Sequence, residues 1–210
     1  MLRIAIRSAA LLALAAFVPA SYGTITIYTS QAAFNAATTA QGVDTFTGFS
    51  ISGTTPSPIS RNAGAYSYQA ACSTSSFFGA GTVANPWLST NVAADTVTFS
   101  AFSASISAIG GNFFGSNSAG SFAAGDVALT VTDGDGTVSQ SIIGATVTSF
   151  LGFVSTNTIT SMTLASVAVP GSVLWPTADN LVLAQAIPAP SCGLALLGVA
   201  GMVARRRRSN

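Results

Sequence analysis

Six aspartates are the only acidic residues in this chain, and they are the side chains best suited to chemistry. The sequence contains no histidine, which excludes histidine general bases and histidine metal ligands. Paired carboxylates serve glycoside hydrolysis, one as the acid and one as the nucleophile or base. No two of the aspartates lie in a distinctive motif, so we expect no catalytic residues, and an aspartate-dependent glycoside hydrolase is only a second alternative. They are Asp44, Asp95, Asp126, Asp133, Asp135 and Asp179.

Two of these aspartates alternate with glycines in a pattern that begins like a calcium-binding loop, Asp133 and Asp135. An EF-hand is excluded because Gly144 stands where that loop needs its bidentate acid. Alternating Asp and Gly is also typical of a tight turn, since Gly adopts positive φ readily and Asp tolerates it. We expect no cofactor. The alternative is a structural calcium ion, with Asp133, Asp135 or Asp179 as ligands and Asn180 beside the last.

Four aromatic side chains are candidates for stacking on sugar rings, because exposed rings bind sugar faces while polar groups nearby bind the hydroxyls. Tyr66 and Tyr68 share one face of a predicted strand, since they are two residues apart. Trp87 lies in a predicted loop, and Trp175 is the fourth candidate. For each ring we expect packing in the core or over a sheet edge. The alternative is a glycan site at Tyr66, Tyr68 and Trp87.

The elements that would position these side chains are predominantly strands. Apolar and polar residues alternate over 127–132, the Asp-Gly run at 133–136 predicts a hairpin turn, and 137–143 reads as the returning strand. Ser30 precedes a predicted helix over 31–37 with Phe34 turned inward. We expect loops at 54–60 and 77–94. Other predicted strands are 24–29, 43–46, 65–69, 96–99, 106–109, 147–154, 159–165 and 180–184. Residues 24–187 therefore predict one all-β domain, an antiparallel β-sandwich or jelly roll.

Charge is scarce in this body. Only 6% of the chain is charged, against about a quarter in an ordinary soluble domain. Arg61 is the only cation between residues 24 and 187, so there is no basic patch to follow phosphates, and nucleic-acid binding is excluded. Strand edges without lysines lack the usual deterrent to pairing, which predicts tolerance of self-association. Cys72 is the only cysteine of the body, and we expect a buried thiol, with an intermolecular bridge as the alternative.

The first 23 residues predict a secretory signal peptide. Arg3 and Arg7 precede a short apolar run, and small residues follow up to Gly23. We expect cleavage after Gly23, with cleavage after Ala20 as the alternative. A signal anchor that is never cut is the other interpretation, although the apolar run is short for a span.

The other end of the chain, residues 188–210, predicts a membrane anchor. Pro188 and Pro190 stop any preceding strand, residues 192–204 form an apolar segment, and Arg205 to Arg208 follow it. A cluster of arginines is retained on the cytoplasmic side, so the body would lie outside the membrane. The alternative is a terminal core helix with a solvated basic tail.

This tail resembles the PEP-CTERM sorting signal of bacterial envelope proteins. The resemblance rests on Pro188-Ala189-Pro190, the short apolar helix and the arginines Arg205, Arg206, Arg207 and Arg208; Ala189 stands where the family has Glu. The same tail is also labelled the C-terminal domain of ice-binding proteins, a label that does not imply ice binding. The resemblance implies processing by an exosortase, a membrane transpeptidase, in bacteria that make exopolysaccharide.

The body resembles the β-sandwich ectodomains that precede such tails, through short segments at 28–34, 109–114, 152–161 and 178–183. That resemblance implies no catalytic residues. We therefore expect an exported, non-catalytic protein of the cell envelope or extracellular matrix, anchored in the membrane at the cell surface or secreted. The first alternative is a carbohydrate-binding module that recognises exopolysaccharide.

Overall fold

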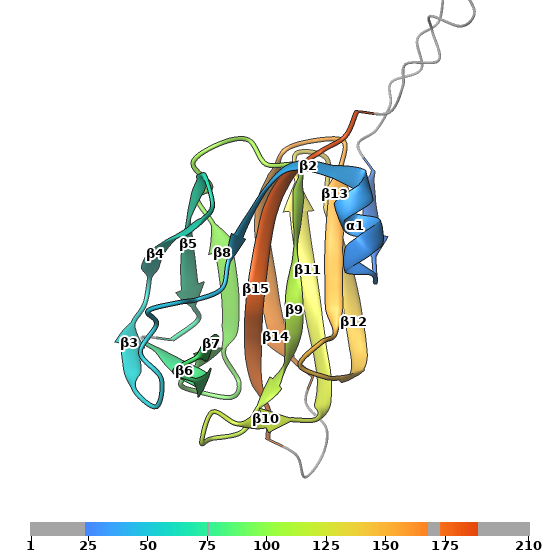
Figure 1. The fold of residues 1–210 in the computed structure, drawn as a ribbon. Helices are drawn as coiled ribbons and strands as arrows, with labels where there is room; N and C mark the ends of the chain where they lie inside the picture. Colours follow the sequence, from blue (N-terminus) through green and yellow to red (C-terminus); the bar gives the residue numbers. More distant parts are fainter. Residues whose placement is uncertain (1–23, 75, 168–172, 189–210) are drawn as a thin grey trace, which may run out of the picture.

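The computed structural model describes residues 24–74, 76–167 and 173–188 of the chain. These residues fold into two antiparallel β-sheets that face each other, with one short helix at one side (Figure 1). For the described residues, the prediction of an all-β fold with one short early helix is therefore confirmed.

The larger sheet contains, in spatial order, β1 (Ile25–Tyr28), β13 (Phe150–Ser155), β9 (Ala108–Ser116), β15 (Trp175–Ala186), β7 (Asn85–Thr90), β6 (Ser76–Thr82) and β3 (Thr54–Pro56). Beside this row, β10 (Phe122–Ala123) pairs with β9 and β2 (Thr38–Asp44) pairs with β15. The smaller sheet contains β12 (Thr137–Ala145), β11 (Gly125–Asp133), β14 (Ile159–Ser166), β8 (Thr96–Ser100), β5 (Tyr66–Cys72) and β4 (Ile59–Ala63). Most neighbouring strands are distant in sequence, so the fold depends on long-range pairing.

The core lies between the two sheets and follows the period-two pattern of the sequence. On β11, Val127, Leu129 and Val131 are fully buried and alternate with half-buried residues. They belong to the same apolar cluster as Phe153 of the larger sheet and Phe99 of the smaller one. Alternation along a strand sends one set of side chains to this shared interior and the other outward. The hairpin predicted at 133–136 joins β11 to β12.

The outer face of the larger sheet is covered at one end by helix α1 (Gln31–Ala37). Phe34 of this helix is fully buried against Phe150, with ring centroids 5.5 Å apart. Gly152 leaves the space for this ring, since a Cβ there would lie 2.4 Å from Phe34 Cδ2. The predicted helix and its inward Phe34 are thus confirmed, and Ser30 precedes the helix without a side-chain capping bond.

Two predicted loops are wrong. Most of the segment 77–94 is the hairpin of β6 and β7, and 54–60 contains β3 and the start of β4. The hairpin escaped prediction because its strands carry adjacent apolar residues and glycines instead of a clean alternation. Phe77 faces the core, while Phe78 points to the outer face opposite Ser89. This outward ring matters for the site described next.

The predicted signal peptide, its cleavage at Gly23, and the tail residues Ala189, Pro190 and Arg205 to Arg208 lie outside the described residues. Pro188 is described and is exposed at the end of the body. None of the helices within the described ranges is long and apolar enough to cross a membrane.

Candidate binding site

Tyr66 and Tyr68 share a strand face as predicted, but that face points inward. Their relative exposures are 6% and 2%, so neither ring offers a face to a sugar: core packing is confirmed for both, and the alternative of a glycan site at these two residues is wrong. The Tyr66 hydroxyl donates to the backbone carbonyl of Ala40 at 2.8 Å, and the Tyr68 hydroxyl donates to Asp44 Oδ2 at 2.7 Å. Alternation along the sequence reveals two faces but not which of them is buried.

Tyr68 belongs to a buried polar network that joins the two sheets. Arg61 Nε donates to Asp44 Oδ2 at 2.7 Å, and its terminal NH2 nitrogen donates to Oδ1 at 2.8 Å. The guanidinium also lies over the rings of Phe46 and Phe49, at 5.2 and 5.9 Å from their centroids. Burial, together with the adjacent carboxylate, raises the pKa of Tyr68 far above its usual value, so the phenol stays a proton donor. These contacts connect Asp44 of the larger sheet to Arg61 and Tyr68 of the smaller sheet, which indicates a structural role rather than a catalytic one.

Asp133 is likewise engaged in holding its turn. Its Oδ1 accepts hydrogen bonds from the backbone N–H groups of Asp135 and Gly136 at 2.8 and 2.9 Å, and its Oδ2 accepts one from Ser155 Oγ at 2.5 Å. Burial alone would raise the pKa of Asp133, but these hydrogen bonds outweigh it and lower the pKa below its usual value. Both oxygens already have donors, which favours the turn interpretation over a calcium ligand. Asp135 lies exposed in the same turn.

Asp179 differs from the other aspartates because one of its oxygens is buried without a hydrogen-bond partner. The residue is 4% exposed, its Oδ2 accepts a long bond from Asn85 Nδ2 at 3.4 Å, and Oδ1 has none. Burial raises the pKa of Asp179 above its usual value. The side chain of Asn180 does not turn to Asp179, since its Nδ2 donates to Asn112 Oδ1 at 3.4 Å. Within the described ranges, acids and cysteines form no group of three or more that could hold a metal ion.

Trp87 lies on the outer face of the larger sheet. Its ring meets the fully buried Phe114 edge-on, with centroids 4.8 Å apart, and its Nε1 is buried without a partner. Gly81 of the neighbouring strand makes room for the indole, because a Cβ there would lie 2.9 Å from Trp87 Cδ2. The tryptophan is therefore packed into this face on a strand that is not a sheet edge, which corresponds to packing rather than to sheet-edge cover.

Beside Trp87, three hydroxyls form a buried hydrogen-bonded group on the same outer face. Thr177 Oγ1 donates to Ser116 Oγ at 2.8 Å and lies 3.1 Å from Ser89 Oγ, and each hydroxyl comes from a different strand. Ser89 also reaches the carbonyl of Pro176 at 3.1 Å. These bonds tie β7, β15 and β9 together and fix the base of a neighbouring pocket.

That pocket has a volume of about 90 Å³. It lies over β7, with Phe78 of β6 on one side and Trp175 of β15 on the other, and the β9–β10 loop closes it. Both rings are half-buried. The remaining lining is polar and uncharged: Ser89, Thr90, Asn91, Asn117 and Ser118. Of the four aromatic candidates in the sequence, Trp175 is the one placed in a concave site.

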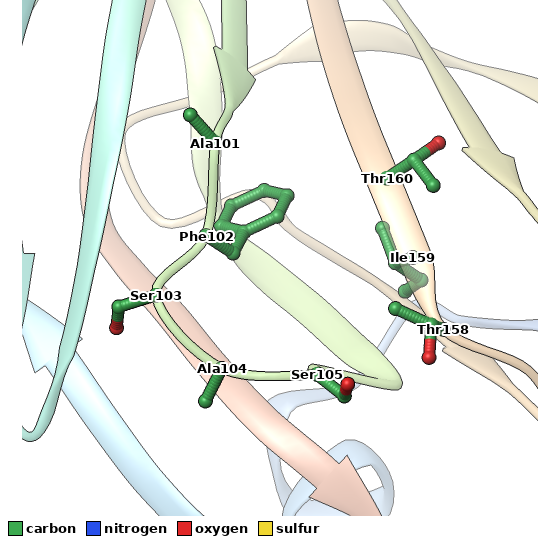
Figure 2. Close-up of a pocket in the computed structure, with 8 residues that line it drawn as sticks. All are labelled: Ala101, Phe102, Ser103, Ala104, Ser105, Thr158, Ile159 and Thr160. Carbon is green, nitrogen blue, oxygen red and sulfur yellow. The ribbon is translucent and has the colours of Figure 1, made fainter.

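A second hollow, of about 400 Å³, lies between the 101–105 loop and the start of β14. Figure 2 shows the Phe102 ring and the Ile159 side chain turned toward each other across it. Ser103 is occupied in holding the loop, because its Oγ accepts the backbone N–H of Ser67 at 2.9 Å. The hollow offers one aromatic ring and several hydroxyls, but its lining contains no amide or charged side chain.

Sequence reasoning missed Phe78, Asn91 and Asn117, which come from segments far apart in the chain. The available signal was the adjacent pair Phe77-Phe78, since neighbouring strand residues point to opposite faces. The comparisons with known proteins add no relative: no family model, no curated protein and no solved structure matches this chain.

Proposed function

We propose that this chain is an exported, non-catalytic β-sandwich protein that acts structurally or adhesively at the cell envelope or in the extracellular matrix. Its N-terminal 23 residues direct export, and its PEP-CTERM-like tail holds it in the membrane, where an exosortase-type enzyme processes it. The sequence order of export signal, charge-poor β body, proline motif, apolar segment and arginines supports this delivery.

The non-catalytic part of the proposal rests on one observation: most charged side chains of the described body hold the fold, with Asp179 as the exception. Asp44 and Arg61 pair with each other, and Asp133 holds a turn. Asp95 accepts hydrogen bonds from Ser73 Oγ at 3.1 Å and from Thr74 Oγ1. An acid and a base that work on a glycosidic bond must instead face a cleft and exchange protons. This arrangement favours a structural protein over a hydrolase.

An edge strand supports the adhesive part of the proposal. Among the described residues, β12 ends the smaller sheet and pairs only with β11, and its residues Thr137–Ala145 include no charge and no proline. Ile143 near its end is 75% exposed. Natural edge strands usually carry charges, prolines or covers that prevent pairing with another chain, and this one lacks the first two.

The experiment is fractionation of cells that express the full chain and a variant with Arg205 to Arg208 replaced by Ser. We expect the native chain in the membrane or surface fraction and the variant shifted to the medium, because the arginines retain the tail on the cytoplasmic side. A matched variant with Asn62→Ser changes an exposed residue of β4, keeps the tail and should not change the distribution of the protein. Identical retention of the native chain and the tail variant contradicts the anchor.

A further inference from the structure

We propose that the pocket between Phe78 and Trp175 binds one sugar unit of a neutral polysaccharide. The two rings come from β6 and β15, on either side of Ser89 in β7. Each ring is half-buried, so each keeps part of its surface for contact. Aromatic rings that flank a hollow supply the apolar contact that the C–H face of a sugar needs.

The polar rim supplies groups that pair with hydroxyls. Within the described part of the chain, Asn91 is hydrogen-bonded only through its backbone N–H, to the Ser76 carbonyl, which leaves its side-chain amide available. Asn117 Oδ1 accepts the backbone N–H groups of Ala119 and Ser121, both at 3.0 Å. Its Nδ2 is thereby held in place as a donor. The Asn91 amide has both a donor and an acceptor available, and a sugar hydroxyl can pair with either because it both donates and accepts.

The wall that carries Asn117 is preorganised. Gly81 N–H donates to the Gly120 carbonyl at 2.8 Å, which fastens the β9–β10 loop to β6. Gly120 has a φ of +75° and lies against the Phe78 ring, which a Cβ would approach to 3.1 Å. The loop and the ring therefore position each other, and little ordering is needed when a ligand binds.

The uncharged lining of the pocket disfavours charged ligands. None of its seven residues is charged, so no group offsets the desolvation of a uronate or sulfate. The volume of about 90 Å³ corresponds to about three water molecules, so it holds one edge of a sugar ring and leaves the rest in solvent. A contact this small predicts a Kd of about 1 mM for a monosaccharide. Several copies on one polymer gain by avidity.

The inference rests on the proposed function only in the choice of an extracellular polysaccharide as the natural ligand; the pocket itself does not depend on where the chain is delivered. Sugar binding is measured on purified protein, whereas delivery is measured in cells. Each can therefore fail without the other.

The test uses the two tryptophans as reporters, because the chain contains no others. The full chain, ¹⁵N-labelled and held in a zwitterionic detergent without a sugar headgroup, is titrated with the methyl glycosides of glucose, galactose and mannose. We expect the Trp175 indole N–H signal to move with at least one of them and to saturate. The Trp87 signal should not move, because its Nε1 is buried and Trp87 does not line the pocket.

Two variants and two controls complete the experiment. Asn91→Ala removes an exposed amide that no described bond uses, so the fold should survive, and we expect about two- to tenfold weaker binding. Trp175→Ala should abolish binding. Asn62→Ala removes an exposed asparagine from β4 and Phe122→Ala an exposed ring outside the lining, and neither should change affinity.

Three outcomes overturn the proposal. The first is no movement of the Trp175 signal with any of the three glycosides up to about 100 mM, far above the expected Kd. The second is an equal response of the two indoles, or unchanged binding by Asn91→Ala. The third is tighter binding of glucuronic acid than of the neutral sugars, which contradicts the role of the uncharged lining.

Discussion

Removing one oxygen atom from the buried network tests how the two sheets are held together. Tyr68→Phe deletes the hydroxyl that donates to Asp44 Oδ2 at 2.7 Å and keeps the ring, which packs 6.0 Å from the Phe99 centroid. No cavity larger than a hydroxyl is created. Asp44 keeps its hydrogen bonds from Arg61 and from the Phe46 backbone N–H. Its carboxylate therefore loses one hydrogen bond but stays paired.

The expected cost follows from the kind of hydrogen bond that is lost. A buried bond to a charged acceptor contributes about 1.5–3 kcal/mol, against about 0.5–1.5 kcal/mol for a bond between neutral groups. Tyr66→Phe is the matched control, because its hydroxyl donates over a similar distance, 2.8 Å, to the neutral carbonyl of Ala40. We therefore expect Tyr68→Phe to lower the free energy of unfolding by about 1 kcal/mol more than Tyr66→Phe does.

The assay is urea unfolding of the native chain and both variants, followed by fluorescence and far-ultraviolet circular dichroism. An unchanged m-value with a lower midpoint identifies a loss of stability rather than a change in the unfolded state. Equal destabilisation by the two variants, or a larger effect of Tyr66→Phe, refutes the claim that the hydrogen bond to the Asp44 carboxylate stabilises the fold more than the bond to the Ala40 carbonyl.

Three further substitutions test local features. Asp133 has a lowered pKa in the folded chain, so its contribution to stability is complete above the unfolded pKa of about 3.9 and is lost as pH falls through the lower folded value. In Asp133→Asn, the free energy of unfolding should therefore fall less steeply below about pH 4 than in the native chain. The same pH dependence in both proteins contradicts the role given to Asp133. Gly79→Ala should destabilise by about 3 kcal/mol or more, because its Cβ would lie 1.7 Å from the Ser50 carbonyl oxygen. Gly136→Ala should change the free energy of unfolding by no more than about 0.5 kcal/mol, because no atom lies within 4 Å of the added Cβ. Thermal melts in which Gly136→Ala is the more destabilised variant contradict this packing.

The strands that could be predicted from the sequence are those with one buried and one exposed face. Val127, Leu129 and Val131 alternate with polar neighbours, and the Asp-Gly turn after them needs no tertiary information. The hairpin of β6 and β7 could not be found in this way, because Phe77 and Phe78 are both largely covered. When both faces of a strand are covered, apolar residues occur at consecutive positions and the alternation of apolar and polar residues is lost.

The candidate pocket was beyond sequence reasoning for a different reason. Phe78, Asn91, Asn117 and Trp175 come from separate strands and a loop, and only the pairing of β6, β7, β15 and β9 brings them together. The same limit applies to Tyr68, whose inward direction is set by the partner Asp44 from a distant strand. Residue type indicated aromatic candidates, but tertiary pairing decides which of them line a pocket.

The proposed delivery to the outside of the cell can be tested most directly by intact-mass measurement of the protein recovered from each cell fraction. The account predicts a mass that lacks residues 1–23, or 1–20 with the alternative cleavage, in the membrane, surface or medium fractions. The complete 210-residue mass, found free in the cytosol and nowhere else, contradicts it.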